Sequence, residues 1–337
     1  SNILTDNGTG LGHGTANVHS GGVYTNNDFS RSSQYGIALW NDSGFTLEGN
    51  NYTDSANGLY FRDCDGMTLA GKDLSAFNIP GRAITLSSVT NSTFININAS
   101  GSGTGYGIHY NAGSNNLFTN NTITGRVTGI LINSVDTDST YDSNILTDNG
   151  TGLGHGTANV HSGGVYTNND FSRSSSFGIA LWNDSGFTLE GNSYTDCANG
   201  IKIQGAESET ISGIDLSSAN ITNYAFLINA NNSTISGNNF SGAGEVGYGI
   251  FLSGGSGNVI SGNIVTGRQT GIVLNWFDNN TVSNNVLTDN QSAIAGWYTK
   301  HPSTGNVIIN NDVSRSSVNA IYLLREANFT LAGNTYD

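Results

Sequence analysis

The chain has 337 residues, of which 46 are glycine, 48 asparagine and only two proline, and its formal net charge is −14. This proline-poor composition excludes collagen, and an 11% share of charged residues with regularly placed apolar ones argues against disorder. The scarcity of Lys and Arg argues against nucleic acid as a partner, and no apolar run is long enough for membrane insertion.

A long repeat of 142 residues organises the chain. Residues 1–54 match residues 143–196 at 51 of 54 positions, and Arg126 recurs in register as Arg268. We expect one domain, 1–337, built from the repeats 1–142, 143–283 and a partial 284–337. Because the first residues already lie inside the repeat, we expect this chain to be a segment of a longer polypeptide.

A shorter repeat lies within the long one. In chain order, apolar runs at 36–39, 45–50, 129–132, 259–263, 271–274 and 307–311 recur among turn-forming Asn, Gly, Asp and Ser. The runs alternate and are too short for helices, so they predict strands, three to a unit of about 23–24 residues. Asn recurs after the first strand of each unit, which predicts a stacked ladder of side-chain amides.

These repeats resemble those of right-handed parallel β-helix proteins in the carbohydrate-binding and sugar-hydrolysis superfamily. That group includes NosD-like periplasmic proteins, pectate-lyase-like enzymes and bacterial or archaeal surface proteins. The resemblance implies an all-β fold, a right-handed parallel β-helix of about 14 coils with three strands in each coil. Because this fold carries lyases, hydrolases, adhesins and scaffolds, the resemblance leaves the function open.

Groups that occur once are the better catalytic candidates, since groups present in every copy are expected to serve the coil. The loop after residue 297 carries Tyr298, Lys300 and His301, and Arg325 and Glu326 follow one coil later. Any of the first three is a candidate base for β-elimination from a uronic acid, with Arg325 neutralising the carboxylate. Hydrolysis would instead use two carboxylates, Asp278 and Glu326. A structural polar rim is the alternative.

Tryptophan and neighbouring carboxylates form the candidate glycan-binding surface. Aromatic faces stack on pyranose rings, and Asp or Asn bonds hydroxyl groups. The candidates are Trp40, Asp42, Trp182, Asp184, Trp276 and Trp297. A structural role at the edge of a coil is the alternative for the tryptophans.

Two groups of side chains are weak metal candidates. The first is the set His13, His19, His155 and His161, for which the NosD resemblance suggests copper. No Cys or Met adjoins them, so hydrogen bonds within the loop are the favoured interpretation. The second is Asp136, Asp138 and Asp142, which have the oxygen ligands that calcium uses, although a polar turn is favoured. We therefore expect no cofactor, with calcium as the one candidate.

Cysteine and asparagine suggest few modifications. Cys64 and Cys197 are 133 residues apart, which is five to six coils, so we expect two buried thiols and no disulfide. Asn-x-Ser/Thr sequons at Asn41, Asn91, Asn183 and Asn279 are glycosylation candidates in an extracellular protein.

The leading functional prediction is an extracellular or cell-surface scaffold or adhesin. Near-identical copies lengthen a solenoid without new chemistry, and exposed end strands predict end-to-end association of copies. The expected partners are therefore extracellular polysaccharide or further copies of the chain. The alternative is a polysaccharide lyase or glycoside hydrolase, or a glycan-binding module without catalysis.

Overall fold

The computed structural model describes all residues except 1, 14–17, 103, 157–158 and 298–302. Two compact units make up the chain, Ser1–Ser172 with Gly186–Ser193 and Arg173–Ser185 with Tyr194–Asp337. The boundary between the units at residue 173 does not coincide with the repeat boundary at residue 143. That the chain is one domain remains a prediction.

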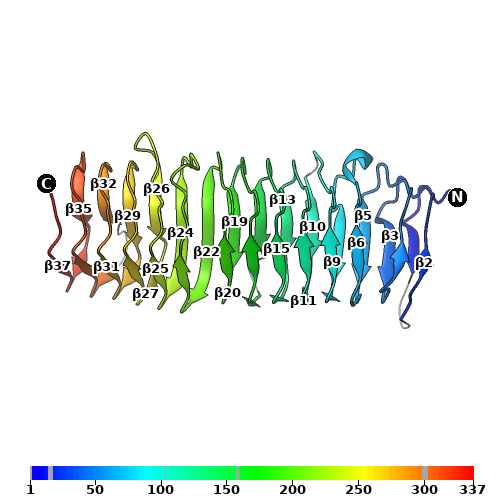
Figure 1. Cartoon of the computed structure of the whole chain (residues 1–337), viewed down its shortest axis with the longest axis horizontal. Coiled ribbons are helices and arrows are strands. Elements are labelled where there is room, and N and C mark those ends of the chain that lie inside the picture. Colours follow the sequence, from blue (N-terminus) through cyan, green and yellow to red (C-terminus); the bar gives the residue numbers. More distant parts are fainter. Residues whose placement is uncertain (1, 14–17, 103, 157–158, 298–302) are drawn as a thin grey trace. The chain divides into compact units, whose positions relative to one another are not determined.

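The first ladder of parallel strands supplies one strand for each turn of the chain. Each unit contributes seven such strands in its described residues, arranged in chain order (Figure 1). In the first unit they are β1 (Thr9–His13), β3 (Tyr35–Trp40), β5 (Asn57–Arg62), β7 (Ile84–Ser87), β10 (Tyr106–Tyr110), β13 (Thr128–Ile132) and β16 (Thr151–His155). In the second unit they are β19 (Phe177–Trp182), β22 (Asn199–Glu207), β24 (Tyr224–Asn231), β26 (Tyr248–Leu252), β29 (Thr270–Asn275), β32 (Ser292–Trp297) and β35 (Asn319–Leu323).

Two further ladders complete the turns. The second ladder has very short strands: β8 (Val89–Thr90), β11 (Gly113–Ser114), β14 (Asp136–Thr137) and β17 (His161–Ser162) in the first unit, and β20 (Asp184–Ser185), β27 (Gly255–Ser256), β30 (Phe277–Asp278), β33 (Ser303–Thr304) and β36 (Glu326–Ala327) in the second. The third ladder has β2 (Gly22–Val23), β4 (Phe45–Thr46), β6 (Thr68–Ala70), β9 (Thr93–Ile95), β12 (Leu117–Thr119), β15 (Thr140–Asp142), β18 (Val165–Thr167) and β21 (Thr188–Glu190) in the first unit. In the second unit the third ladder is a separate sheet of β23 (Thr210–Ser212), β25 (Thr234–Ser236), β28 (Val259–Ser261), β31 (Thr281–Ser283), β34 (Val307–Ile309) and β37 (Thr330–Ala332).

Alternation along each strand places equivalent apolar residues in columns inside the coil. Ile37, Leu59, Ile84 and Ile108 occupy one register position on neighbouring strands and are all buried. A second column is aromatic: Phe118 stacks on Phe94 and on Tyr141 with ring centroids 4.8 Å apart. One turn cannot bury these faces, so the stacking of turns itself forms the core.

The predicted asparagine ladder is confirmed. The backbone N–H of Asn121 donates to Oδ1 of Asn144 at 3.0 Å, and Asn144 donates in the same way to Asn169 at 3.0 Å. Each amide also donates from Nδ2 to a carbonyl oxygen of the preceding turn, as Asn144 does to Phe118 at 2.9 Å. These bonds satisfy buried polar groups at the corner of each turn that carries this asparagine.

The structure confirms the all-β parallel solenoid with three strands per turn, and pairing within it is parallel throughout the described strands. The one helical element, η1 (Ser75–Phe77), is a single turn of 3₁₀ helix in the described part of the first unit. Cys64 and Cys197 are both buried thiols. Within the described residues, no helix has the length and apolar composition to cross a membrane.

Candidate functional site

The third ladder of the first unit is interrupted between two turns. β2 pairs with β4, whereas β6 begins a separate sheet that continues to β21. The row of isolated β-bridges is interrupted between the same two turns. Asn51 pairs with Asp28 of the preceding turn and Asp73 with Asn98 of the following one, but Asn51 and Asp73 do not pair with each other. The backbones of residues 45–51 and 68–73 are therefore not joined by strand pairing.

Lys72 occupies the interrupted position of the asparagine ladder. Asn2, Asn27 and Asn50 form the ladder before the break, and it resumes at Asn121. The Nζ of Lys72 donates to the carbonyl oxygen of Leu47 at 2.7 Å. This is the carbonyl that a ladder amide would reach, three residues before Asn50. An ammonium group has no acceptor, so it cannot receive the N–H of Asn50 as an amide oxygen would.

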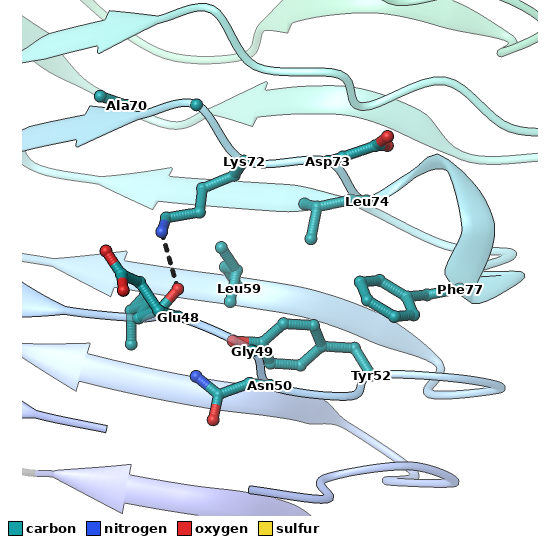
Figure 2. A pocket seen from close by; sticks show the side chains of 12 residues that line it. Glu48, Gly49, Asn50, Tyr52, Leu59, Ala70, Lys72, Asp73, Leu74 and Phe77 are labelled. Atoms are coloured by element: carbon teal, nitrogen blue, oxygen red, sulfur yellow. Dashed lines mark hydrogen bonds between the residues drawn. The ribbon is translucent and has the colours of Figure 1, made fainter. Parts of the chain in front are cut away.

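A cavity of about 430 Å³ opens where the turns separate. Its floor is apolar, formed by the buried side chains of Leu47, Tyr52, Leu59 and Leu74. Figure 2 shows Glu48 and Lys72 at one end of the pocket and Phe77 at the other. The remaining lining residues are Gly49, Asn50, Ala70, Gly71 and Asp73. The volume lies in the range of small-ligand sites, and an apolar floor with a few polar groups is typical of them.

Two aromatic side chains shape the pocket wall. The rings of Tyr52 and Phe77 meet edge to face with centroids 5.5 Å apart. Burial raises the pKa of the Tyr52 hydroxyl well above its ordinary value, so this group is protonated at every physiological pH. Phe77 is the last residue of η1, and its carbonyl oxygen accepts the N–H of Asp54 at 2.9 Å. The short helix thus fixes the ring at the mouth of the cavity.

The second copy of the repeat supplies an internal comparison. Most lining residues recur 142 positions later, including Glu190, Tyr194 and Asp215 for Glu48, Tyr52 and Asp73. Two side chains of the pocket change strongly in character: Lys72 is replaced by Ile214, and Phe77 by Ala219. The asparagine ladder is interrupted at both positions, but the lysine at the interruption and the ring at the mouth are particular to the first copy.

A second cavity of about 410 Å³ lies against the same helix. Ser75 and Ala76 of η1 line it, whereas Phe77 lines the first cavity. Its other lining residues are Asn78, Ile79, Pro80, Ser100, Gly101, Ser102 and Thr104. None of these side chains carries a charge.

Two tryptophans of the candidate glycan surface, Trp40 and Trp182, lie on the outer face of the first ladder, and each has a cation over its ring. The guanidinium carbon of Arg62 lies 5.7 Å from the ring centroid of Trp40, and Nζ of Lys202 lies 4.3 Å from that of Trp182. The two carboxylates are placed differently from our prediction. Asp42 and Asp184 are 0% and 2% exposed, so they lie beneath the surface and not on an exposed strip.

The predicted catalytic residues are only partly within the described structure. Tyr298, Lys300 and His301 lie outside the described residues. Glu326 accepts a hydrogen bond from Nδ2 of Asn306 at 2.9 Å, and burial raises the pKa of its carboxyl group. Arg325 precedes it at a left-handed turn. Of the tryptophans nearby, Trp276 is 45% exposed and Trp297 contacts Tyr248 edge to face, with centroids 5.5 Å apart.

The sequon asparagines all sit at tight turns. Asn41, Asn91, Asn183 and Asn279 have φ between 48° and 54°, the left-handed conformation that asparagine tolerates. Nδ2 of Asn91 donates to Oδ1 of Asp65 at 2.7 Å. Glycosylation at these sites remains a prediction.

Sequence comparison identifies the family. A model of the NosD family, described as periplasmic copper-binding protein, matches residues 156–328, just over half of the chain. The chain belongs to the NosD family. A second model, described as right handed beta helix region, matches residues 35–194. None of the curated proteins compared with this NosD chain matches it.

Several solved structures are similar in fold to this NosD protein. A PL6 alginate lyase in complex with a trisaccharide has a TM-score of 0.49 and 13% identity, over 95% of this chain and 80% of that one. An alginate lyase from Paenibacillus sp. str. FPU-7 has 0.42 and 14%, over 81% and 92%. PfbA, a surface adhesin of Streptococcus pneumoniae, has 0.41 and 13%, over 93% and 84%. At these identities the likeness concerns the fold alone.

The copper that the NosD description implies does not fit the described histidines. The rings of His13 and His19 are tilted by 48° with centroids 3.7 Å apart, and Nδ1 of His13 lies 3.9 Å from Oδ2 of Asp42. In the second copy, Nε2 of His155 is hydrogen-bonded to the Tyr166 hydroxyl at 2.8 Å. Among the described residues, no three His, Cys, Asp or Glu side chains are grouped as a metal site.

The calcium candidates belong to different hydrogen-bond networks. Asp136 is buried and accepts bonds from Tyr110, Ser139 and Tyr141 at 2.6–3.0 Å. Asp142 accepts bonds from residues of the next turn, including Thr167 at 2.8 Å. Asp138 occupies a left-handed turn. Calcium binding by these residues remains a prediction.

Proposed function

We propose that this NosD-family chain is a non-catalytic glycan-binding protein that holds one sugar residue of a polysaccharide in the pocket between β4 and β6. The supporting observation is the cavity itself, which combines an apolar floor with hydrogen-bonding groups at its rim. A pyranose ring has the same division, with apolar C–H faces and hydroxyl groups around its edge. Tyr52 and Phe77 offer the ring contacts, and Lys72 and Glu48 offer a donor and an acceptor.

Binding explains the pocket better than catalysis does. Its two carboxylates recur in the second copy, as expected of residues that serve the coil. Asp73 also accepts bonds from the N–H and hydroxyl of Ser75, at 2.9 and 2.7 Å. The side chains particular to the first copy are an amine bonded to a backbone carbonyl and a phenyl ring, neither of which is a base or nucleophile here.

The cellular setting belongs to the same proposal. The NosD description names periplasmic proteins, and polysaccharides are abundant in the periplasm and outside the cell. We therefore place the chain there, with polysaccharide as its partner. A solenoid that carries a glycan pocket also suits a surface scaffold or adhesin, the role predicted first from the repeats. End-to-end association of copies remains a separate prediction.

Three variants test the location of the site. Lys72→Asn extends the ladder by one position after Asn50, and the double variant Lys72→Ile with Phe77→Ala gives the pocket the residues of the second copy. Both should lose glycan binding on an oligosaccharide array and in calorimetry. Ile214→Asn, the same ladder position in the second copy, is the matched control and should bind normally.

Two results would refute this function. One is the absence of binding to any glycan on a broad panel. The other is binding that survives both pocket variants but disappears in Trp40→Ala with Trp182→Ala, which would place the site on the outer face of the first ladder.

A further inference from the structure

The charges around the first pocket restrict which sugars it can hold. Three charged side chains line the cavity, and two of them, Glu48 and Asp73, are carboxylates exposed at its rim. Lys72 is the only cation among the lining residues. At neutral pH the pocket therefore carries a formal charge of −1, on a chain whose net charge is −14.

The one cation is also poorly placed to bind an anion. Nζ of Lys72 donates to the Leu47 carbonyl at 2.7 Å, the acceptor that a ladder amide would otherwise use. This hydrogen bond holds the amine in place. Glu48 lies at the same end of the pocket, beside this amine (Figure 2). A sugar carboxylate that approached Lys72 would thus approach Glu48 as well. The repulsion between the two carboxylates would offset the attraction of the ammonium group.

The second cavity also favours an uncharged sugar over an anionic one. Its lining of Ser, Thr, Asn, Ala, Gly, Ile and Pro side chains offers hydroxyl and amide groups but no cation. η1 lines both cavities, so a glycan chain held in the first would continue past a surface suited to hydroxyl groups. Nearby, the guanidinium of Arg126 is buried and bonded to the carbonyl oxygens of Ile79, Ala99 and Ser100. It is therefore not available to a carboxylate.

We infer that the sugar accepted by the pocket is an uncharged pyranose, and that the polymer recognised is a neutral hexose glycan and not a polyuronate. This inference rests on the proposed glycan-binding function and names its substrate class. Lys72 donates to a hydroxyl group with its remaining N–H groups, and Glu48 accepts from another. Recognition of a neutral sugar needs no neutralising cation, and the only cation that lines this pocket, Lys72, is bonded to the Leu47 carbonyl and lies beside Glu48.

Calorimetry with defined hexasaccharides tests the inference on the full chain. The probes are hexamers of glucose or mannose in several linkages, and hexaguluronate, hexamannuronate and hexagalacturonate. We expect at least one neutral hexamer to bind about tenfold or more tightly than every uronate at low ionic strength. Glu48→Gln should narrow that ratio several-fold, because it removes the repelling charge. Glu190→Gln removes the same charge from the second-copy position and should leave the ratio unchanged.

The outcomes separate this inference from the function on which it rests. Uronates that bind more tightly than all neutral hexamers, and lose binding in Lys72→Asn, would overturn the inference while supporting the pocket as a glycan site. Equal effects of Glu48→Gln and Glu190→Gln would also overturn it, because the selectivity would then come from the charge of the whole chain. No binding to either class would overturn the proposed function itself.

Discussion

Arg126 and Ile79 are 47 residues apart in sequence, and Nη1 of the arginine donates to the carbonyl oxygen of the isoleucine at 2.7 Å. The same side chain donates to Ala99 at 3.1 Å and to Ser100 at 3.1 Å, so one buried cation joins three successive turns. Arg268 repeats this arrangement in the second unit, where it donates to Ile221, Phe240 and Ser241. Each arginine therefore supplies the donors for three backbone carbonyl oxygens.

Arg126→Met should destabilise the first unit by about 2–4 kcal/mol, because buried carbonyl oxygens lose their donors. Hydrogen exchange measured by mass spectrometry should show faster exchange in turns around 79–101. Arg268→Met should act in the same way around 221–242. A uniform change over the whole chain in either variant would contradict this account of local stapling.

Lys72→Asn should stabilise the protein while it abolishes binding. An amide at position 72 can donate to Leu47, as Lys72 does, and can also accept the N–H of Asn50. One additional buried hydrogen bond is worth about 1 kcal/mol, so the free energy of unfolding in urea should rise by about that amount. A lower stability would show that the lysine, and not the interruption, is the favoured local structure. Ile214→Asn serves as the comparison at the corresponding position.

The repeats were enough to predict the solenoid, because stacking of alike turns leaves few other ways to bury their apolar columns. The interrupted ladder also had a signal in the sequence, since Lys72 stands where Asn is expected. The pocket itself could not be predicted. Its depth depends on how far the backbones separate and on where the Phe77 ring lies, and neither follows from residue types.

The burial of Asp42 shows a second limit of sequence patterns. Continued alternation from Trp40 would place Asp42 outside. The strand ends at Trp40, however, and Asn41 adopts a left-handed conformation with φ of 52°. This turn reverses the alternation and directs the next side chain inward. The alternation of inward and outward side chains therefore holds along a strand and fails at the corner that follows it.

Acid should weaken the fold through His109. Burial, with a smaller contribution from the charge of Arg82, lowers the pKa of His109 to about 4, whereas an unfolded histidine titrates near 6.5. Between these values the unfolded chain binds more protons, so stability falls as the pH drops from about 6.5 to 4. The full contribution is about 3 kcal/mol.

His109→Phe, which introduces the residue found in the second copy as Phe251, should flatten this dependence in urea unfolding at several pH values. The difference in pH dependence between the original protein and the variant gives the contribution of His109 alone. His161, whose pKa is also lowered to about 4, and Asp136, whose pKa is raised by burial, titrate in both. Identical slopes for the two proteins between pH 6.5 and 4 would disprove the role of His109.

Gly305→Ala should destabilise the second unit by more than an ordinary turn substitution does. Gly305 has φ of +73°, and a Cβ there would clash with Oδ1 of Asn279 from the preceding turn. The left-handed backbone costs an alanine about 1–2 kcal/mol, and the clash adds about 1–3 kcal/mol. Gly237→Ala is the control, because Gly237 has φ of +65° with open space around it and pays only the backbone cost.

A double-mutant cycle with Asn279→Ala should recover the clash energy, since the second substitution removes the atom that the new methyl group meets. Stability would be measured by urea unfolding of the four proteins. If Gly305→Ala costs no more than Gly237→Ala, or if the cycle shows no coupling, then the asparagine of one turn does not select the glycine of the next.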